Sequence, residues 1–323
     1  MDMALVARRP GGPEVMEWVE VETPAPGPGE VLLRHTAIGV NFIDIYHRSG
    51  LYPWAAESLI PGAEAAGVVE AVGPGVTTLA PGDRVAYVMT TGAYRQRRVV
   101  PADRLVRLPD AIPDAVAASV MLKGLTAQYL VTSSYAVQPG DTVLVHAAAG
   151  GVGLLLGQWI AALGARAIGT AGGPAKVALA LAHGYSDVID YSATDFAPEV
   201  ARLTEGAFCA AVYDSVGRDT WRGSLACLRR FGSFVNFGQS SGMIEDFRLS
   251  DLAKGSLSAC RPVLFDYVAE RADLERRAAD LFTRLARGEI RADVVTTRPL
   301  QEAAAAHVAL EGRKTTGTTV LIP

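Results

Sequence analysis

A glycine-rich turn is the segment of this 323-residue chain whose residue types and spacing point most directly to chemistry. Residues 146–153 read HAAAGGVG, between a β-type run and an apolar helical stretch. Gly150 and Gly153 hold the second and third places of a G-x-G-x-x-G pattern, with Ala148 in the first. A side chain at Gly150 would block the approach of a pyrophosphate, and Gly153 lets the helix pack on its strand. An ordinary crossover turn is the alternative, but the flanking strand and helix favour a dinucleotide site, with phosphates facing the backbone of Ala149, Gly150, Gly151 and Val152.

The end of the second expected strand determines which nicotinamide dinucleotide fits. An NAD site of this type places an acid about 20 residues after the first glycine, where it bonds the ribose 2′-hydroxyl. The count from Ala148 reaches Gly169 and Thr170, and neither is an acid. The chain continues TAGGPAK, so Gly172, Lys176 and Tyr191 are assigned to the cofactor site, the last two as partners of a 2′-phosphate. Lys176 could equally be a solvated helix lysine, but the missing carboxylate favours NADPH over NADH.

The chain has two parts with different patterns of expected secondary structure. The first 120 residues are dense in Pro and Gly, with short β-branched runs between tight turns, which indicates an all-β arrangement. From Asp141 onward, short apolar strands alternate with helical stretches, which predicts a parallel sheet with right-handed crossovers. We therefore expect an α/β fold in which a doubly wound domain, residues 124–262, is inserted into a β-rich domain formed by residues 1–123 and 263–323.

Composition limits the partners and the compartment. Thirty Lys and Arg residues against 34 Asp and Glu give a net charge of −4, which provides no general field for nucleic acid or anionic lipid. The three cysteines form no close pair of the kind that binds zinc or marks a redox dithiol. Residues 142–165 lack charge and are long enough to span a bilayer, but five glycines interrupt them. The amino end lacks the apolar core of a secretory signal, so we expect a cytoplasmic protein without a membrane partner.

Several segments together resemble a known enzyme family. They are AIGVNFIDIYHRSGLYP, PGAEAAGVV, GDRVAY, LKGLTAQYL, HAAAGGVGLL, YDSVGRDTW, FGQSSG, GSLSACRP and the terminal LIP. The chain is similar over nearly its whole length to zeta-crystallin-type quinone oxidoreductases, members of the medium-chain dehydrogenase/reductase superfamily. The resemblance implies a GroES-like catalytic domain, a Rossmann domain as the doubly wound part, NADPH as cofactor, and a homodimer formed along the edge of the Rossmann sheet.

The resemblance also indicates whether the chain binds a catalytic zinc ion. Zinc members of the superfamily carry catalytic ligands at three places, which here correspond to Asn41, Ala63 and Lys123. These residues do not make a zinc site, the four-cysteine structural lobe is missing, and the five histidines lack ligand spacing. We therefore expect no metal, and hydride chemistry carried by the cofactor while the protein positions the acceptor.

The resemblance implies three catalytic residues in the amino-terminal part. Asn41, Tyr46 and Tyr52 would lie beside the nicotinamide and hydrogen-bond an acceptor oxygen as it gains negative charge. The role of Asn41 has further support, because a polar side chain inside an apolar run needs a reason to be there, and Asn41 is also assigned to the cofactor. Tyr52 could instead be packing in its loop beside Trp54. Asp44 and Glu64 are expected to be structural.

The remaining cofactor contacts are carried over from the family motifs. They are Thr126, Ser215, Phe237, Gly238, Ser240 and Arg261. Core packing is the alternative for Phe237, and an interdomain ion pair is the alternative for Arg261.

Three functions remain open at this stage. The leading hypothesis is a metal-free NADPH-dependent quinone reductase. The first rival is an enone or alkenal reductase that delivers hydride to a carbon–carbon double bond and needs a proton donor near the α-carbon. The second rival is a non-enzymatic structural or RNA-binding role, and its local support is the basic run Arg95, Arg97 and Arg98 beside Tyr94. A solvated strand face is the favoured interpretation of that run, so a nucleic-acid partner is not expected.

Overall fold

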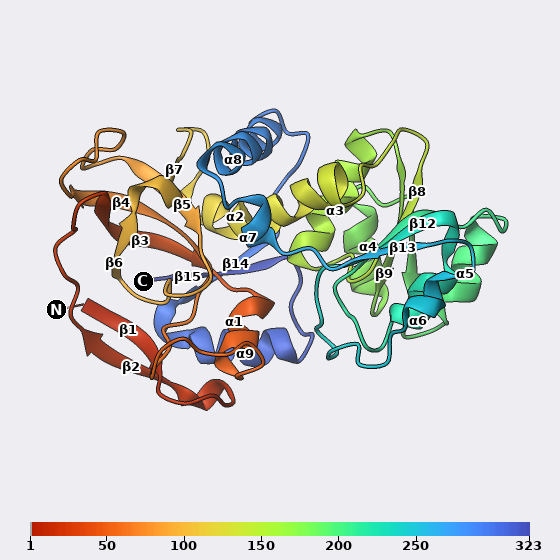
Figure 1. Cartoon of the computed structure of the whole chain (residues 1–323), viewed down its shortest axis with the longest axis horizontal. Helices are drawn as coiled ribbons and strands as arrows, with labels where there is room; N and C mark the ends of the chain where they lie inside the picture. Colours follow the sequence, from red (N-terminus) through yellow and green to blue (C-terminus); the bar gives the residue numbers. More distant parts are fainter. Residues whose placement is uncertain (1) are drawn as a thin grey trace. The chain divides into compact units, whose positions relative to one another are not determined.

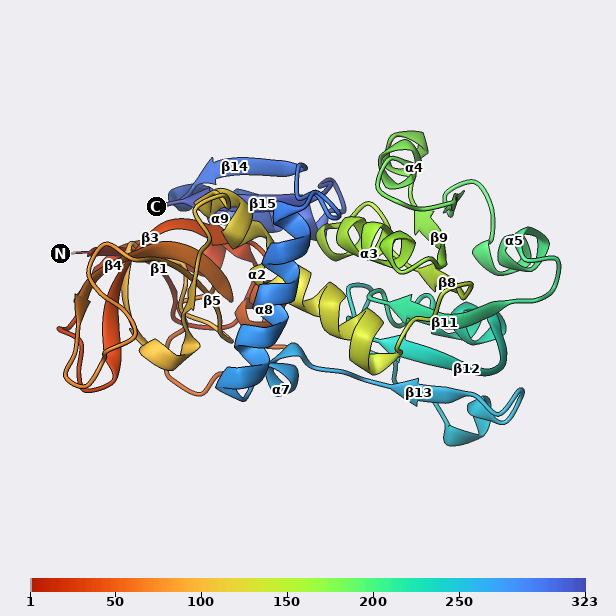
Figure 2. The same ribbon diagram turned by 90° about the horizontal axis from the view of Figure 1, so that it is seen from above.

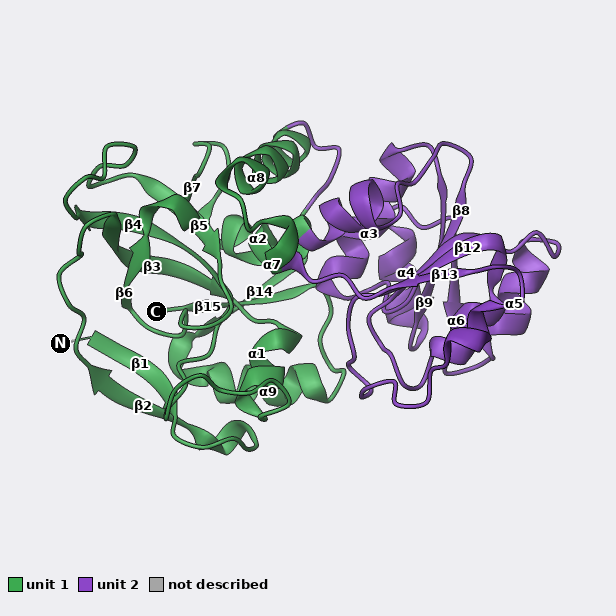
Figure 3. Ribbon diagram, viewed as in Figure 1, with its two compact units in different colours: residues 1–125, 265–286, 292–323 green, residues 126–264, 287–291 purple. Residues whose placement is uncertain are grey.

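The computed structural model describes residues 2–323 and divides into two compact units (Figure 3). Unit 1 comprises residues 1–125, 265–286 and 292–323, and unit 2 comprises residues 126–264 and 287–291. These divisions lie two residues beyond the expected limits at 123 and 262, and the short segment 287–291, expected in the β-rich part, groups with unit 2. Each unit has its own sheet system, as the change of texture along the chain predicts.

Unit 1 is rich in strands (Figure 1). They are β1 (Asp2–Ala7), β2 (Met16–Val21), β3 (Glu30–Gly39), β4 (Glu64–Val72), β5 (Arg84–Val88), β6 (Arg97–Pro101), β7 (Val106–Arg107), β14 (Val295–Pro299) and β15 (Thr318–Ile322). β1 and β2 pair antiparallel, and the others form a seven-stranded sheet in the order β14-β15-β3-β4-β5-β7, with β6 on β3. The sheet thus includes a strand from the last residues of the sequence, β15.

The unit 1 helices are α1 (Phe42–Arg48), α2 (Asp114–Tyr129), α7 (Leu264–Tyr267), α8 (Arg271–Ala286) and α9 (Ala303–Glu311), with the division between the units falling inside α2 and at the start of α7. Helix α8 has an apolar stripe on which Leu274, Ala278 and Leu281 are buried and Leu285 is half-buried. Helix α8 lies beside α2 (Figure 2). The two helices pack closely, because a Cβ on Gly124 would lie 2.7 Å from the Leu281 side chain. This packing holds the α2 residues next to Gly124 in a fixed place.

Unit 2 has one parallel sheet of six strands. They are β8 (Thr142–Val145), β9 (Arg166–Ala171), β10 (Asp187–Asp190), β11 (Cys209–Asp214), β12 (Leu228–Asn236) and β13 (Ser258–Cys260). The order is β10-β9-β8-β11-β12-β13, so the chain winds one way from β8 and the other way from β11. In such a sheet, ligands bind outside the carboxyl ends of the strands at the point where the order reverses, here between β8 and β11.

The unit 2 helices are α3 (Gly151–Ala162), α4 (Pro174–Leu181), α5 (Phe196–Leu203) and α6 (Trp221–Ala226). They contact each other and the sheet in two pairs, α3 with α4 and α5 with α6. Leu144, Ile168 and Val212 from three adjacent strands lie in one buried apolar cluster beneath the second pair. The strands are short apolar runs because helices pack on them.

One helical stretch in the described part of the chain is long and apolar enough to cross a bilayer. It runs from Asp114 to Ser134 and continues α2 by a π-helical turn, Leu130–Ser134. About three-quarters of its apolar window, 78%, is buried inside the protein, and core helices of soluble proteins pass the same test of length and composition. The uncharged stretch of residues 142–165 contains a strand, a turn and α3 instead of a single span.

Candidate functional site

The glycine-rich turn connects β8 to α3. Ala147 has φ of 54°, and the Gly150 amide donates a hydrogen bond to the Ala147 carbonyl at 2.9 Å, which turns the chain sharply. A Cβ on Gly153 would lie 2.3 Å from the Ala147 carbonyl oxygen, so only glycine allows α3 to approach the turn. Gly150 is the N-cap of α3 and has no side chain to occupy the first amides of the helix. The turn therefore fits the phosphates of a dinucleotide.

The other expected cofactor residues of unit 2 follow the carboxyl ends of the same parallel strands. By strand, they are Ala149, Gly150, Gly151 and Val152 after β8, Gly172 and Lys176 after β9, Tyr191 after β10, Ser215 after β11, Phe237, Gly238 and Ser240 after β12, and Arg261 after β13. Because these ends share one edge of the sheet, residues far apart in sequence are brought to one side of unit 2. Thr126, in contrast, is a buried residue of α2.

The loops that follow β11 and β12 contact each other. The Ser240 amide donates to the Ser215 carbonyl at 3.1 Å, and a Cβ on Gly238 would lie only 2.7 Å from that carbonyl oxygen. Arg261 is exposed, and its guanidinium donates to the Asn236 carbonyl at 3.2 Å, so a partner for it exists within unit 2. Phe237 is half-buried instead of part of the core, and its amide donates to the Asp214 carbonyl at 2.9 Å.

A buried polar chain beneath these loops was not found from the sequence. Asp214 is fully buried and accepts from the amides of Val216 and Gly217, at 2.8 and 2.9 Å, and from the Ser224 hydroxyl at 2.8 Å. Since Ser224 donates its only proton to Asp214, His146 Nε2 must donate to Ser224, at 3.0 Å.

The same series of hydrogen bonds fixes the tautomer of His146. Its Nδ1 then accepts from the Thr170 hydroxyl at 2.9 Å, so all donors of the chain run in one direction from Thr170 to Asp214. Burial lowers the pKa of His146, which keeps the imidazole neutral, although Asp214 opposes that shift. The chain joins the ends of β8, β9 and β11 and orients the Asp214 loop that carries Ser215.

The end of β9 carries the residues expected to distinguish the two cofactors. A Cβ on Gly172 would lie 2.8 Å from the Tyr191 hydroxyl, so Tyr191 lies directly beside Gly172. A carboxylate that counting along the chain missed also reaches this turn, from β10: Asp190 accepts from the Gly173 amide at 2.9 Å. Its same oxygen accepts from the amide and hydroxyl of Ser192, and these bonds hold the pKa of Asp190 below its ordinary value. Asp190 is therefore occupied in shaping the turn.

In unit 1, Asn41, Glu64 and Lys123 form a compact buried cluster. Glu64 begins β4 and is fully buried, and a single oxygen, Oε1, accepts from Lys123 Nζ at 2.5 Å and from Asn41 Nδ2 at 3.0 Å. Its Oε2 accepts from the Leu122 amide at 2.5 Å. The Asn41 side chain, which we expected to face an acceptor, thus directs its amide nitrogen to Glu64. Glu64 is structural in the expected sense, but it also sets the position of two polar side chains.

A second buried chain of hydrogen bonds begins at Asp44. Its carboxylate accepts from the Asn41 amide at 2.8 Å and from the Tyr94 hydroxyl at 3.0 Å. His307 Nε2 lies 2.9 Å from that hydroxyl, and His307 Nδ1 lies 3.1 Å from Arg48 Nη1. Because a guanidinium only donates, His307 must accept at Nδ1 and donate at Nε2 to Tyr94. Asp44 therefore has a structural role, as expected, at the end of a chain of fixed direction.

The outer end of this chain is an ion pair. Arg48, 2% exposed, donates to both carboxylate oxygens of Glu311, at 2.7 and 3.1 Å. Burial lowers the pKa of His307 to about 3, with a further contribution from Arg48, so the imidazole is neutral at physiological pH.

Burial raises the pKa of Asp44 to about 7. Hydrogen bonds from Asn41 and Tyr94 and the charge of Lys123 oppose this shift, and Glu64 adds to it. Between the ordinary value of 3.8 and about 7, the folded protein therefore holds a proton on Asp44 that the unfolded chain has released. The contribution of Asp44 to stability is thus complete below the lower value and is lost as the pH rises toward the upper one.

We predict that Asp44→Asn steepens the rise of stability with pH. Buried neutral histidines such as His307 make the free energy of unfolding increase with pH below their ordinary pKa, and Asp44 opposes that increase over an overlapping range. Asparagine does not titrate, so in this variant nothing at position 44 should oppose the increase of the free energy of unfolding with pH that the histidines cause. Urea unfolding at a series of pH values from acid to neutral measures both slopes. Asp110→Asn, at an exposed position of unit 1, is the control, and equal slopes in wild type and Asp44→Asn would contradict the assignment.

Tyr46 and Tyr52 lie side by side and half-buried. Their ring centroids are 5.3 Å apart in an edge-on arrangement, and the Tyr52 amide donates to the Tyr46 carbonyl at 3.0 Å. Tyr52 also meets the His47 ring edge-on at 5.4 Å, whereas the indole of Trp54 donates to the His47 carbonyl at 2.5 Å. The two tyrosines thus act as a pair at the end of α1, which begins directly after Asn41.

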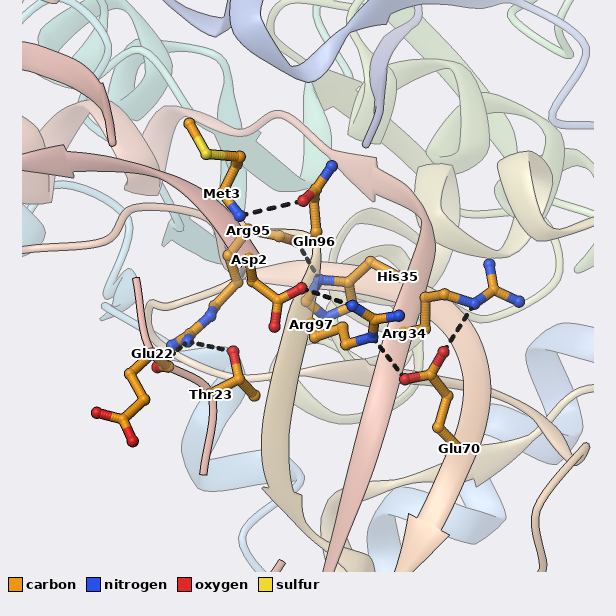
Figure 4. Close-up of polar contacts among 10 residues, drawn as sticks. All are labelled: Asp2, Met3, Glu22, Thr23, Arg34, His35, Glu70, Arg95, Gln96 and Arg97. Atoms are coloured by element: carbon orange, nitrogen blue, oxygen red, sulfur yellow. Dashed lines mark hydrogen bonds and ion pairs between the residues drawn. The ribbon is translucent and has the colours of Figure 1, made fainter. Parts of the chain in front are cut away.

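The basic run at the start of β6, Arg95, Arg97 and Arg98, makes contacts within unit 1. Arg97 donates to Asp2 at 2.8 Å and to Glu70 at 2.6 Å, and Glu70 also pairs with Arg34 at 3.1 Å (Figure 4). These contacts connect β1, β3, β4 and β6. Arg97 is therefore a link between strands.

The other two arginines of the run are also half-buried. Arg95 donates to the Thr23 hydroxyl at 3.2 Å (Figure 4), and Arg98 donates to the Tyr87 hydroxyl at 3.1 Å and lies over the same ring. The favoured interpretation, a solvated strand face, describes only part of the arrangement, because the Arg97 side chain is 41% exposed and all three side chains also have partners in the protein. The arrangement leaves no local motive for RNA binding.

Within residues 2–323, no group of three or more His, Cys, Asp or Glu side chains is arranged to hold a metal ion. The positions that correspond to zinc ligands hold an amide, a methyl group and an ammonium group, at Asn41, Ala63 and Lys123. The ammonium is a donor without a lone pair, so this set does not fit a cation.

Comparison with known proteins identifies relatives over the full length. The family model described as zinc-binding dehydrogenase matches residues 151–283, and that of the alcohol dehydrogenase GroES-like domain matches residues 27–110. A quinone oxidoreductase of Pseudomonas aeruginosa is 49% identical over 97% of each chain, and a 2-haloacrylate reductase of a Burkholderia species is 44% identical over 100% of this chain and 99% of the relative.

A solved structure gives the same result. The crystal structure of Escherichia coli quinone oxidoreductase complexed with NADPH is similar at a TM-score of 0.97, with 43% identity over 99% of this chain and 100% of the other. The GroES-like and Rossmann parts expected from the resemblance are both confirmed by the matching models and by this structure. The chain belongs to the quinone oxidoreductase family of the medium-chain dehydrogenase/reductase superfamily.

Proposed function

We propose that this protein is an NADPH-dependent quinone oxidoreductase that works without a metal. The observation that carries the proposal is the turn from β8 to α3, where Gly150 and Gly153 leave the first amides of a helix open at the switch point of a parallel sheet. NADPH supplies a hydride when it is bound. The chain itself binds and orients that cofactor and the acceptor. A relative 49% identical is a quinone oxidoreductase, and a structural neighbour is complexed with NADPH.

The residues proposed for these roles are divided between the two units. Tyr46 and Tyr52 are the proposed hydrogen-bond donors to the acceptor oxygen, and Asn41, whose amide nitrogen donates to Glu64, is proposed to line the same site. The proposed cofactor residues are Asn41, Thr126, Ala149, Gly150, Gly151, Val152, Gly172, Lys176, Tyr191, Ser215, Phe237, Gly238, Ser240 and Arg261.

The test is an assay of NADPH oxidation by the purified protein with a simple quinone, followed by NADPH fluorescence. We expect turnover with NADPH and benzoquinone that survives treatment with a chelator. Absence of oxidation with any quinone, in a protein that binds NADPH by calorimetry, would contradict the acceptor class and leave the cofactor assignment intact.

A conjugated alkene is the second candidate acceptor. The Burkholderia relative is a 2-haloacrylate reductase, and an acrylate has a carbon–carbon double bond conjugated to its carboxylate. Running the same assay with an alkenone and with 2-chloroacrylate separates the two acceptor classes. Turnover with these substrates and none with quinones would make the alkene the substrate.

We predict that Lys176→Ala weakens NADPH binding far more than NADH binding. A hydrogen bond to a charged group contributes about 1.5–3 kcal/mol, so the Kd for NADPH should rise roughly tenfold to hundredfold while that for NADH changes little. Calorimetric titration with both cofactors measures the two changes, and Lys254→Ala, at an exposed position of unit 2, is the control. Equal losses for both cofactors would show that Lys176 does not face the 2′-phosphate.

Assembly and compartment complete the proposal. We propose a homodimer formed along the edge of the unit 2 sheet, since β13 is an edge strand and its three residues are exposed. Sedimentation of the protein at micromolar concentration tests the dimer. We also propose a cytoplasmic enzyme without a membrane partner, and the free state of all three cysteines agrees with a reducing compartment.

A further inference from the structure

Lys123 is a buried cation with unused donors. Its side chain is 7% exposed, and Glu64 is its acceptor at 2.5 Å. An ammonium group has three N–H donors, and in the part of the chain that the structure describes, Glu64 is the only hydrogen-bond acceptor found for them. Two donors of a buried cation are therefore available to a group that the protein does not itself supply.

The neighbouring donor does not have this capacity. Asn41 Nδ2 directs its hydrogens to Glu64 Oε1, at 3.0 Å, and to the Gly39 carbonyl, at 3.5 Å, so both point into the protein. The packing around Glu64 is also tight, since a Cβ on Gly39 would lie 2.3 Å from Glu64 Oε1 and from the Ala118 carbonyl oxygen. The carboxylate is also held by Lys123 Nζ and by the Leu122 amide, so the contact with Asn41 is one of three that fix it. Lys123 is thus the donor of this cluster that is left for a ligand.

Burying the ion pair of Lys123 and Glu64 is unfavourable in free energy. Removing two charges from water costs several kcal/mol for each, and apolar residues of similar size are often as stable or more stable in such a place. Lys123 and Glu64 are both buried, on α2 and β4, in a unit that has an ordinary apolar core around Leu33, Ile38 and Val85. A fixed positive charge at this point is explained better by a task than by the stability of the fold.

We propose that the ammonium group of Lys123 is a catalytic group that binds the acceptor oxygen as it becomes negatively charged, and that Glu64 is the positioning residue that holds it there. The inference rests on the proposed function and adds to it the group that stabilises the anion. Preorganised donors at a developing oxyanion are worth most where water is excluded, and Lys123 meets that condition.

The reaction balances with the proposed cosubstrates. A quinone that gains a hydride, two electrons and one proton, becomes the hydroquinone monoanion, and NADPH becomes NADP⁺. The Lys123 ammonium pairs with that oxyanion without changing its own bonds. A proton from water then completes the hydroquinone.

A binding experiment tests this inference without turnover. The enzyme saturated with NADP⁺ is titrated with 4-nitrophenol, whose anion absorbs visible light and resembles a hydroquinone monoanion. We expect the wild type to bind the phenolate roughly tenfold more tightly than the phenol, which lowers the pKa of the bound probe by about one unit. Lys123→Met should lose this preference, and Lys314→Met, at an exposed position of unit 1, should retain it. A wild type with no preference, or a preference that survives in Lys123→Met, would overturn the proposal.

Because Lys123→Met leaves Glu64 buried without its cation, a second variant guards against misfolding. Glu64→Gln combined with Lys123→Met removes both charges, so it should recover stability while phenolate selectivity stays lost. Its kcat with quinone should fall roughly 10²–10³-fold, as for loss of one oxyanion donor, with the Kd for NADPH unchanged. A double variant with wild-type kcat would overturn the role of Lys123. A wild type that selects the phenolate but reduces no quinone would contradict only the quinone assignment.

Discussion

Replacing Gly153 with Val should yield a protein that no longer binds NADPH and is clearly less stable. The Cβ would lie 2.3 Å from the Ala147 carbonyl oxygen and 2.7 Å from that of Ala148, and both contacts are backbone. Neither atom can move without displacing the turn from which α3 begins, so the amides of Gly150 and Gly151 would leave their places. Overpacking typically costs about 1–3 kcal/mol, and contacts with backbone belong at the upper end of that range.

Chemical denaturation and calorimetric titration with NADPH measure the two effects of Gly153→Val. The matched control is Ala161→Val, which adds a β-branched residue to an exposed position of the same helix. We expect the control to lose only a few tenths of a kcal/mol of stability, from helix propensity, and to bind NADPH normally. Normal NADPH affinity in Gly153→Val would show that the cofactor does not lie on this turn.

The second large effect is expected from Glu64→Gln. The glutamine amide has almost the same shape as the carboxylate, but it leaves the Lys123 ammonium buried without an opposite charge. Breaking a buried ion pair from one side typically costs about 3–5 kcal/mol. The variant should therefore unfold at a much lower urea concentration than the wild type.

A double-mutant cycle separates the effect of the unpaired Lys123 charge from the other effects of each substitution. Adding Lys123→Met to Glu64→Gln removes the unpaired ammonium and should restore a large part of the stability. Thermal or urea unfolding of the four proteins gives the coupling between the two positions. If the two substitutions instead add independently, the short contact between Lys123 and Glu64 makes no contribution to the folded state.

The features that the sequence predicts well are local. The HAAAGGVG turn depends on glycines three residues apart, and the pattern correctly indicates the strand β8 and the helix α3 beside it, whereas the phosphate site on the turn stays a prediction. The alternation of strands and helices after Asp141 likewise predicts which residues follow strand ends, and therefore the cofactor edge of unit 2. The same reasoning places Tyr191 near the turn after β9, where it lies beside Gly172, and the role of Lys176 stays a prediction.

The features that it misses are contacts between distant residues. Arg48 and His307 are 259 positions apart, and nothing in either local segment indicates that the two side chains meet in the core. Lys123 and Glu64 are 59 positions apart, and only the packing of α2 on β4 brings them together. The orientation of Asn41 was hidden for the same reason, since Glu64 determines it. Long-range pairing depends on the register of the sheet and on helix packing, which a single sequence does not reveal.

The chain from Arg48 through His307 and Tyr94 to Asp44 has a consequence for proton traffic. Each member passes a hydrogen toward Asp44, and shifting every one of them along would require Arg48 to give up a proton. A guanidinium does not do so in water. Proton transfer along this hydrogen-bond chain is therefore blocked at Arg48. Protons from bulk solvent must reach the cluster of Asn41, Glu64 and Lys123 by another path. The hydrogen-bond chain thus links Asp44 to Glu311 at the surface, but it does not carry protons from solvent to Asp44.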